Sequence, residues 1–463
     1  MPTWKGFALL ALAVCGSGCS RTPDASAGSA VPQANAIPVA DENAAGRRQP
    51  VERVSPSAAP GRPSRPWAAA AEGGDFHFDR VAVEPIEQDW LPVHVVVGDV
   101  TGDRRPDVVM SMGDNGSVGY TGEVQLRIYV QQPDGSLASP EKIRIQGAMD
   151  PPHSLALAQL DADGTAEIVV HDQTGLTVVS RSGEGFTMAW TPGRVRSGPI
   201  AAVDANGDRR QDIFVQGIEM RDGADIFLGS GRGGIGSVSH LDTPFISPYG
   251  TGEASDFTGD GLPDVVIFSG YLVRVFPYEW NFGLREPIEV DVRTVQETFP
   301  AGGTVADMDD DGRPDLVLSD RGDNGIPLPK GIHVHYRGPD DGFSHSTFLE
   351  TNDSIYMDPS VVRVADVDRN GYPDIVTMFD HLGLMGYILQ GPSGFDPAVY
   401  QSTDDIQGTG WYRDDSFAIA DVNSDWCPDV VLAEPSSSLV IFYGRNCRVP
   451  VPRTGGPLPP VRR

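Results

Sequence analysis

A short acidic motif recurs seven times along the 463-residue chain, and this recurrence limits the possible folds more than any other feature. The clearest copy is Asp307-Met-Asp-Asp-Asp-Gly-Arg-Pro-Asp315, which lies between two runs of branched apolar residues. Carboxylates on alternate residues, a glycine at the sixth position and a final acid are typical of loops that bind Ca²⁺. Glycine suits the sixth position because it adopts positive φ at little cost. The motif therefore predicts a calcium loop between two strands.

We number the loops 1 to 7 in chain order and the positions in each loop from 1 to 9. The first positions are residues 99, 159, 204, 256, 307, 366 and 421, and a spacing of this size indicates a repeat architecture. Side chains at positions 1, 3, 5 and 9 are the candidate calcium ligands. In six loops they are Asp99, Thr101, Asp103 and Asp107; Asp204, Asn206, Asp208 and Asp212; Asp256, Thr258, Asp260 and Asp264; Asp307, Asp309, Asp311 and Asp315; Asp366, Asp368, Asn370 and Asp374; and Asp421, Asn423, Asp425 and Asp429.

The seven loops differ at their key positions. Loop 2 begins with Gln159 and diverges most from the motif. Loops 1, 3 and 7 carry Arg104, Arg209 and Trp426 at position 6, where glycine is expected. A residue other than glycine is uncommon at positive φ, so these three loops are expected to be distorted and to bind metal more weakly. Loop 5 has acids at all four ligand positions and is expected to be the best site.

The sevenfold repeat resembles the FG-GAP/VCBS family, the blade repeat of integrin α-subunit heads and of many bacterial surface proteins. The resemblance covers roughly residues 75 to 447 and lies in the calcium-loop half of the repeat, since the Phe-Gly and Gly-Ala-Pro tripeptides are not evident. It implies an all-β fold, a β-propeller with one four-stranded sheet per blade. The loops themselves predict several structural Ca²⁺ ions as cofactors.

The last repeat lacks a fourth strand. Its three strands are predicted at Phe417–Val422, Asp429–Glu434 and Ser438–Gly444, and Pro-rich sequence follows. The alternating stretch Asp75–Val83, ahead of loop 1, is predicted to complete this blade and close the ring, because closure removes an exposed sheet edge. The sequence thus predicts a seven-bladed propeller over residues 75–449, with a Pro-rich tail at 450–463.

The N-terminal residues have the features of an export signal. Lys5 precedes a short apolar run, so residues 1–18 are predicted to be a signal peptide. Gly16-Ser-Gly-Cys19 resembles a bacterial lipobox with Cys19 as the acylated residue. Residues 19–74 are rich in Ala, Pro and Ser and are predicted to be a disordered linker. We expect a lipoprotein of the bacterial cell envelope, with membrane contact only through the anchor; plain secretion is the alternative.

Charge and cysteine content narrow the function further. The net charge of −29 excludes a nucleic-acid binder, and much of it comes from the candidate ligands. In an exported chain, Cys427 and Cys447 favour a disulfide. The predicted hairpin of the last blade turns near Ser436, which places residue 447 close to Cys427.

One face of the predicted ring gathers aromatic residues. The metal loops lie on one face, and the loops that enter each blade lie on the other. Trp90 precedes blade 1, and Trp411 with Tyr412 precedes blade 7, so these three are expected to be neighbours in the ring and to bind a ligand. The alternative is that they cap the central channel. Further along, His333, His335 and His345 are expected to be exposed strand residues rather than a metal site.

The function predicted from these features is a monomeric, calcium-stabilised binding module for a protein or carbohydrate ligand at the cell surface. Two alternatives remain open. One is a polysaccharide lyase or hydrolase with its catalytic residues on the aromatic face, although the sequence contains no recognisable catalytic motif. The other is a structural scaffold of an envelope assembly.

Overall fold

The computed structural model describes residues 75–448 except for 86–89, 115–123, 146–153, 162, 173–174, 184, 195–197, 218–222, 242–250, 270–271, 280–282, 293–299, 321–329, 340–341, 344, 353–357, 381–382, 404–415 and 435–437. All of these residues belong to the unit Ser55–Arg463. The predicted signal peptide, linker and tail lie outside them. The described residues form strands and no helix, and they therefore contain no helix that could span a membrane.

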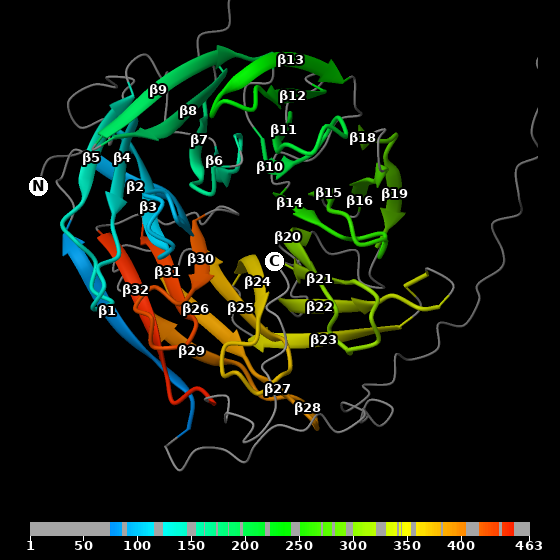
Figure 1. Cartoon of the computed structure of the whole chain (residues 1–463). Coiled ribbons are helices and arrows are strands. Elements are labelled where there is room, and N and C mark those ends of the chain that lie inside the picture. The colour runs from blue at the N-terminus through cyan, green and yellow to red at the C-terminus, as the bar shows by residue number, and fades with distance from the viewer. Residues whose placement is uncertain are drawn as a thin grey trace, which may run out of the picture. The chain divides into compact units, whose positions relative to one another are not determined.

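Seven four-stranded antiparallel sheets succeed one another around a ring (Figure 1). This confirms the predicted all-β, seven-bladed propeller. Blades 1 to 3 consist of β2 (Trp90–Gly98), β3 (Asp107–Asp114), β4 (Val124–Tyr129) and β5 (Glu141–Ile145); β6 (Ser154–Ala158), β7 (Glu167–His171), β8 (Gly175–Ser182) and β9 (Gly185–Pro192); and β10 (Ile200–Val203), β11 (Asp212–Gln216), β12 (Ala224–Gly229) and β13 (Ile235–Leu241).

Blades 4 to 6 follow the same order. They consist of β14 (Thr251–Ser255), β15 (Asp264–Ser269), β16 (Leu272–Phe276) and β19 (Ile288–Asp291); β20 (Pro300–Ala306), β21 (Asp315–Asp320), β22 (Lys330–Tyr336) and β23 (His345–Asn352); and β24 (Asp358–Ala365), β25 (Asp374–Asp380), β26 (Leu384–Ile388) and β29 (Val399–Ser402). Two short ribbons interrupt the last hairpin of blades 4 and 6. They are β17 (Tyr278–Glu279) with β18 (Gly283–Leu284), and β27 (Gln390–Gly391) with β28 (Gly394–Phe395).

The first strand of the chain completes the last blade. Blade 7 contains β30 (Phe417–Ala420), β31 (Asp429–Glu434), β32 (Ser438–Arg445) and, at its outer edge, β1 (His77–Pro85). The register of β1 on β32 runs from His77 opposite Arg445 to Pro85 opposite Ser438. The predicted closure by an N-terminal strand is therefore confirmed, and β32 has a partner along both of its edges.

The hydrophobic core consists of seven clusters, one between each pair of neighbouring blades. Each central strand contributes alternate residues to the two clusters on its two sides, so buried branched residues occupy both of its faces. In blade 5, for example, Leu316 packs toward blade 4 and Val317 toward blade 6. Each blade is thus stabilised by its neighbours rather than by a core of its own.

Two histidines of β22 are buried, and the expectation that they would be exposed is wrong. His333 and His335 are 8% and 7% exposed, whereas His345 is exposed as expected. They share a sheet face with Leu316 and Leu318, which pack against blade 4. His333 Nε2 lies 2.9 Å from Asp320 Oδ2, and the rings of His333 and His335 are 5.8 Å apart. Burial, with His333 nearby, lowers the pKa of His335 to about 4.

Because His335 is buried, we expect the stability of the folded protein to decrease at acid pH. Because the folded state resists protonation of His335, the unfolded state binds more protons between about pH 6.5 and pH 4, and stability falls as the pH decreases through this window. Between pH 7 and pH 5, the free energy of unfolding should fall by about 1–2 kcal/mol less in His335→Leu than in the wild type. Urea denaturation at the two pH values measures this difference. His345→Leu is the control and should follow the wild type; equal losses in all three proteins would contradict the prediction.

Candidate metal centres

In each blade a metal loop connects the first strand to the second. The side chain at position 1 accepts backbone hydrogen bonds from within its own loop. In six of the seven loops the N–H of position 6 donates to Oδ2 of the first aspartate, at 2.6–3.0 Å. Further N–H groups reach its Oδ1, such as Gly102 on Asp99 at 2.6 Å and Asp425 on Asp421 at 3.1 Å. The loop backbone thus surrounds this carboxylate with N–H donors.

Position 6 has positive φ in every loop, whatever the residue. Gly164, Gly261, Gly312 and Gly371 lie at φ 84 to 94°, and Arg104, Arg209 and Trp426 lie at φ 68, 70 and 76°. The expected distortion of loops 1, 3 and 7 is therefore wrong. The hydrogen bond to the first aspartate offsets a strain that costs about 1–2 kcal/mol in a residue with a Cβ. Positive φ at position 6 is common to all seven repeats.

The acid at position 9 begins the second strand and is buried in every blade, with at most 4% exposure. One of its oxygens accepts an N–H from the start of its own loop, such as Val367 on Asp374 at 2.8 Å. In six blades its other oxygen accepts an N–H at or just beyond the end of the third strand, at 2.7–3.0 Å. This carboxylate therefore joins the metal loop to the third strand of the same blade.

These buried acids are poorly stabilised as anions in the absence of a cation. Burial is the largest cause that raises their pKa, and neighbouring loop carboxylates raise it further, while backbone N–H groups lower it. The pKa rises to about 6 for Glu167 and Asp212, to about 7 for Asp315 and Asp429, and to about 8 for Asp374. A divalent cation in the loop would offset this repulsion.

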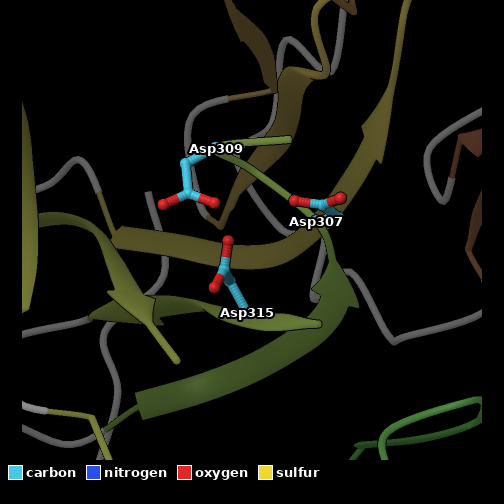
Figure 2. A group of neighbouring side chains, drawn as sticks. All are labelled: Asp307, Asp309 and Asp315. Carbon is cyan, nitrogen blue, oxygen red and sulfur yellow. The ribbon is translucent and has the colours of Figure 1, made fainter. Parts of the chain in front are cut away.

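Loops 5 and 6 each bring three carboxylates together. Oxygens of Asp307, Asp309 and Asp315 lie within 4.8 Å of one another, and those of Asp366, Asp368 and Asp374 do likewise. Figure 2 shows the first group, with the three side chains converging from the loop and from the start of β21. These oxygens match the donors that Ca²⁺ prefers. In the second group Asp366 Oδ1 is buried and accepts no hydrogen bond from the described residues, which leaves it available as a ligand.

The acid at position 5 is paired with an arginine in loops 1, 5 and 7, and its predicted role as a metal ligand stays a prediction. Asp311 is paired with Arg313, whose backbone N–H and guanidinium both contact its carboxylate. Asp103 is held by Arg105 in the same way, and Asp425 Oδ2 lies 2.9 Å from Arg445 Nη1. An arginine thus pairs with the position-5 acid in these loops, and the carboxylates that converge in loops 5 and 6 are those at positions 1, 3 and 9.

Neutral oxygen donors occupy ligand positions in the remaining loops. Position 3 is Thr101, Asn206, Thr258 or Asn423 in loops 1, 3, 4 and 7, and position 5 is Asn370 in loop 6. Loop 2 keeps Asp161, Asp163 and Gly164, and its Glu167 accepts the N–H of Leu160 at 2.8 Å. All of these donors are hard oxygen atoms, and the residues present fit Ca²⁺ in donor type.

Four residues link neighbouring blades in a way that the sequence did not reveal. Each follows the third strand of its blade, and its N–H donates to the position-9 acid of that blade. Its side chain reaches the metal loop of the preceding blade. Gln131 donates to Val422 O, Gln390 to Met308 O at 3.2 Å, Tyr278 to Asp204 Oδ2 at 3.1 Å, and Arg337 to Phe257 O. We call these four the bridging residues.

Other hydrogen bonds make the same connection where no bridging side chain is present. Ala166 N donates to Asp99 O at 2.9 Å, Gln159 N to Gln211 Oε1 at 2.6 Å, and Arg448 N to Asp368 O at 3.0 Å. With the bridging residues, these bonds join each of the seven metal loops to the blade that follows it. The metal loops are therefore part of the blade interfaces.

A pocket of about 330 Å³ lies between loops 5 and 6. It is lined by Asp307, Asp310, Asp366, Gly371, Tyr372 and Pro373. Two of these carboxylates belong to the two metal-site groups described above, so the pocket is an opening from solvent onto both sites.

Loop 7 is additionally constrained by a disulfide. Cys427, which follows Trp426, is bonded to Cys447 beyond β32, and their Cα atoms are 5.6 Å apart. The loop also contacts blade 1: the carbonyl of Asn423 lies so close to Gly135 that a Cβ there would be 2.0 Å from it. Gly135 adopts φ +81°, so both the space and the backbone at this contact require glycine.

The predicted aromatic face is described only at Trp90, because Trp411 and Tyr412 lie outside the described residues. Trp90 is the first residue of β2 and is partly buried against the core cluster between blades 7 and 1. The guanidinium of Arg144 lies 5.9 Å from its ring. Much of this ring is therefore packed within the propeller.

The comparisons with known proteins agree with the repeat pattern. Residues 256–318, which include loops 4 and 5, match the family model described as FG-GAP-like repeat. This match covers the metal loops of blades 4 and 5 within the seven-bladed fold. No curated protein sequence matches the chain.

The chain is similar to several solved structures. An Agrocybe aegerita lectin, described as recognising non-reducing terminal N-acetylglucosamine, is 18% identical over 68% of this chain and 81% of its own, with a TM-score of 0.49. BBS1N, solved in complex with ARL6DN, is 11% identical over 82% of this chain and 98% of its own, with a TM-score of 0.47. The Bacillus licheniformis rhamnogalacturonan lyase PL11 is 14% identical over 79% of this chain and 75% of its own, with a TM-score of 0.36.

Proposed function

We propose that this propeller of FG-GAP-like repeats is a calcium-stabilised binding module of the cell envelope, with a protein or a carbohydrate as its ligand. The observation that supports it most is the shared geometry of the loops, in which acidic oxygens converge at positions 1, 3 and 9 of loops 5 and 6. When bound, Ca²⁺ would neutralise these carboxylates and hold each loop in shape. The loops in turn contact the neighbouring blades, so the ion would rigidify the ring.

The metal would have a structural role in this proposal. The position-9 acid is buried and bound to two backbone N–H groups, and the position-1 acid is bound to its own loop. These contacts hold the ligands in place rather than present them to a substrate. Loops on a rigid ring of this kind are well suited to carry a binding surface, because little ordering is required when the ligand binds.

We expect millimolar Ca²⁺ to raise the melting temperature by about 5–10 °C over the value in chelator, since a ligand of the native state alone stabilises that state. Asp309→Ala should reduce this rise and change the melting temperature in chelator much less. Asp396→Ala, which removes an exposed acid outside the metal loops, is the matched control and should keep the full rise. Equal melting of the wild type in chelator and in Ca²⁺ would contradict the calcium part of the proposal.

The binding part is tested with the full chain in Ca²⁺. Immobilised protein is offered an envelope extract and, separately, a glycan array, and the bound molecules are identified. A protein or glycan recovered in Ca²⁺ and lost in chelator supports the proposal, whereas recovery of neither contradicts it. The proposal also includes a lipid anchor at Cys19, and release of Cys19→Ala from the membrane fraction tests that part.

A further inference from the structure

The side chain of Trp426 is presented to solvent at the centre of loop 7. It is 64% exposed, and among the large apolar side chains of the described residues it is the most exposed. It occupies position 6, where loops 2, 4, 5 and 6 have glycine, and its φ is 76°. A tryptophan at this position adds strain to the backbone and buries little surface in return. Its presence is therefore not explained by the stability of the loop.

The indole is held by a rigid backbone. The N–H groups of Asp425, Trp426 and Cys427 all donate to loop carboxylates, at 3.1, 3.0 and 2.9 Å. Cys427 is also bonded covalently to Cys447. The backbone that carries the ring therefore needs no ordering when the ring contacts a ligand, which favours binding.

The surroundings of Trp426 are polar. Asp425 lies beside it in the chain, and Arg445 bridges Asp425 and Asp79, with N–O distances of 2.9 and 3.0 Å. These side chains are each between about a third and a half exposed, so they are accessible to a ligand. The other large apolar side chains that are exposed in the described residues lie at or next to strands: Val81, Leu91, Met188, Trp190, Val238, Ile288 and Val399.

We propose that Trp426, with Asp425 and Arg445, forms a glycan subsite on the metal-loop face of blade 7. A single aromatic ring within a polar rim matches a pyranose, which has an apolar C–H face and hydroxyl groups around its edge. A protein partner more often uses a cluster of apolar anchors in a larger desolvated patch. This inference rests on the proposed binding function and assigns a ligand class and a place to it, away from the predicted aromatic face.

Trp426→Gly tests the subsite without endangering the fold, because glycine is the residue of loops 2, 4, 5 and 6 and adopts positive φ readily. The full chain is offered to an array of bacterial, plant, fungal and animal glycans in Ca²⁺, and the strongest binder is then titrated. We expect the variant to bind that glycan about thirtyfold more weakly, the effect of losing an aromatic anchor. Its melting temperature should equal or exceed that of the wild type.

Trp190→Ala is the matched control, since Trp190 is 56% exposed on the outer strand of blade 2 and should not affect glycan binding. Equal glycan affinity of the wild type and Trp426→Gly overturns the subsite but leaves the proposed binding function intact. The absence of any bound glycan overturns the subsite as well. If Trp426→Gly loses an envelope protein instead, the surface belongs to a protein partner and the glycan assignment is wrong.

Discussion

Removal of residues 1–84 is expected to unfold blade 7 or to convert the protein into an aggregating species, whereas removal of residues 1–72 should leave a stable monomer. The longer deletion removes β1, which pairs with β32 along its whole length. It also removes Phe78, which is 3% exposed and packs against Tyr387 with ring centroids 5.2 Å apart. The edge of β32 would then be unpaired and open to pairing with another chain.

The contribution of β1 extends beyond blade 7. Arg80 donates to Thr403 O at 2.9 Å, and Gln401 Nε2 donates to Phe78 O at 2.8 Å, so β1 also holds the outer strand of blade 6. Circular dichroism, urea denaturation and size-exclusion chromatography compare the two deletions. Phe78→Ala in the full chain should alone cost about 3–5 kcal/mol, as for other buried aromatic residues. If the shorter protein is equally monomeric and stable, β1 does not contribute to closure as the structure indicates.

A second large effect is expected from Asp374→Ala. Asp374 is fully buried and accepts the N–H of Val367 at 2.8 Å and the N–H of Gln390 at 2.7 Å. Alanine would leave both buried donors without an acceptor, at about 1–3 kcal/mol each, so we expect a loss of about 2–5 kcal/mol in urea denaturation. The measurement is made in chelator, which separates this structural loss from any effect on metal binding.

Asp374→Asn provides a finer comparison. Its amide has one oxygen, so one of the two N–H groups keeps an acceptor and the loss in chelator should be smaller than for alanine. In Ca²⁺ the amide lacks the negative charge, and most of the stabilisation that the wild type gains at loop 6 should disappear. A loss below about 1 kcal/mol for Asp374→Ala in chelator would show that the two hydrogen bonds contribute little.

The sequence predicts the fold well because its main determinant is local. Each loop motif lies between two short apolar strands, and the number of motifs sets the number of blades. The assignment of β1 to the last blade follows from one missing strand, and the structure has this strand at His77–Pro85. The disulfide between Cys427 and Cys447 also lies within one hairpin and its neighbourhood. Patterns that lie within one repeat can be recognised in a single sequence.

Contacts between repeats cannot be predicted from a single sequence in the same way. Gln390 reaches Met308 across 82 positions, and Gln131 reaches Val422 across 291, and neither residue type stands out in the sequence. The burial of His333 and His335 also depends on packing against another blade. For Arg104, Arg209 and Trp426, the propensity for negative φ was the wrong guide, because the hydrogen bond to the first aspartate overrides it.

The pairing of β1 with β32 also sets an order of events in time. During synthesis β1 emerges first, and its partner follows only after nearly all of the blades, roughly 20–70 s later at common rates of translation. Throughout this interval β1 cannot adopt its native pairing. The seam between blades 7 and 1 can therefore form only after the last strands are synthesised, together with the contact of Gln131 on loop 7. The blades can form one after another during synthesis, but the propeller closes only in a single late step.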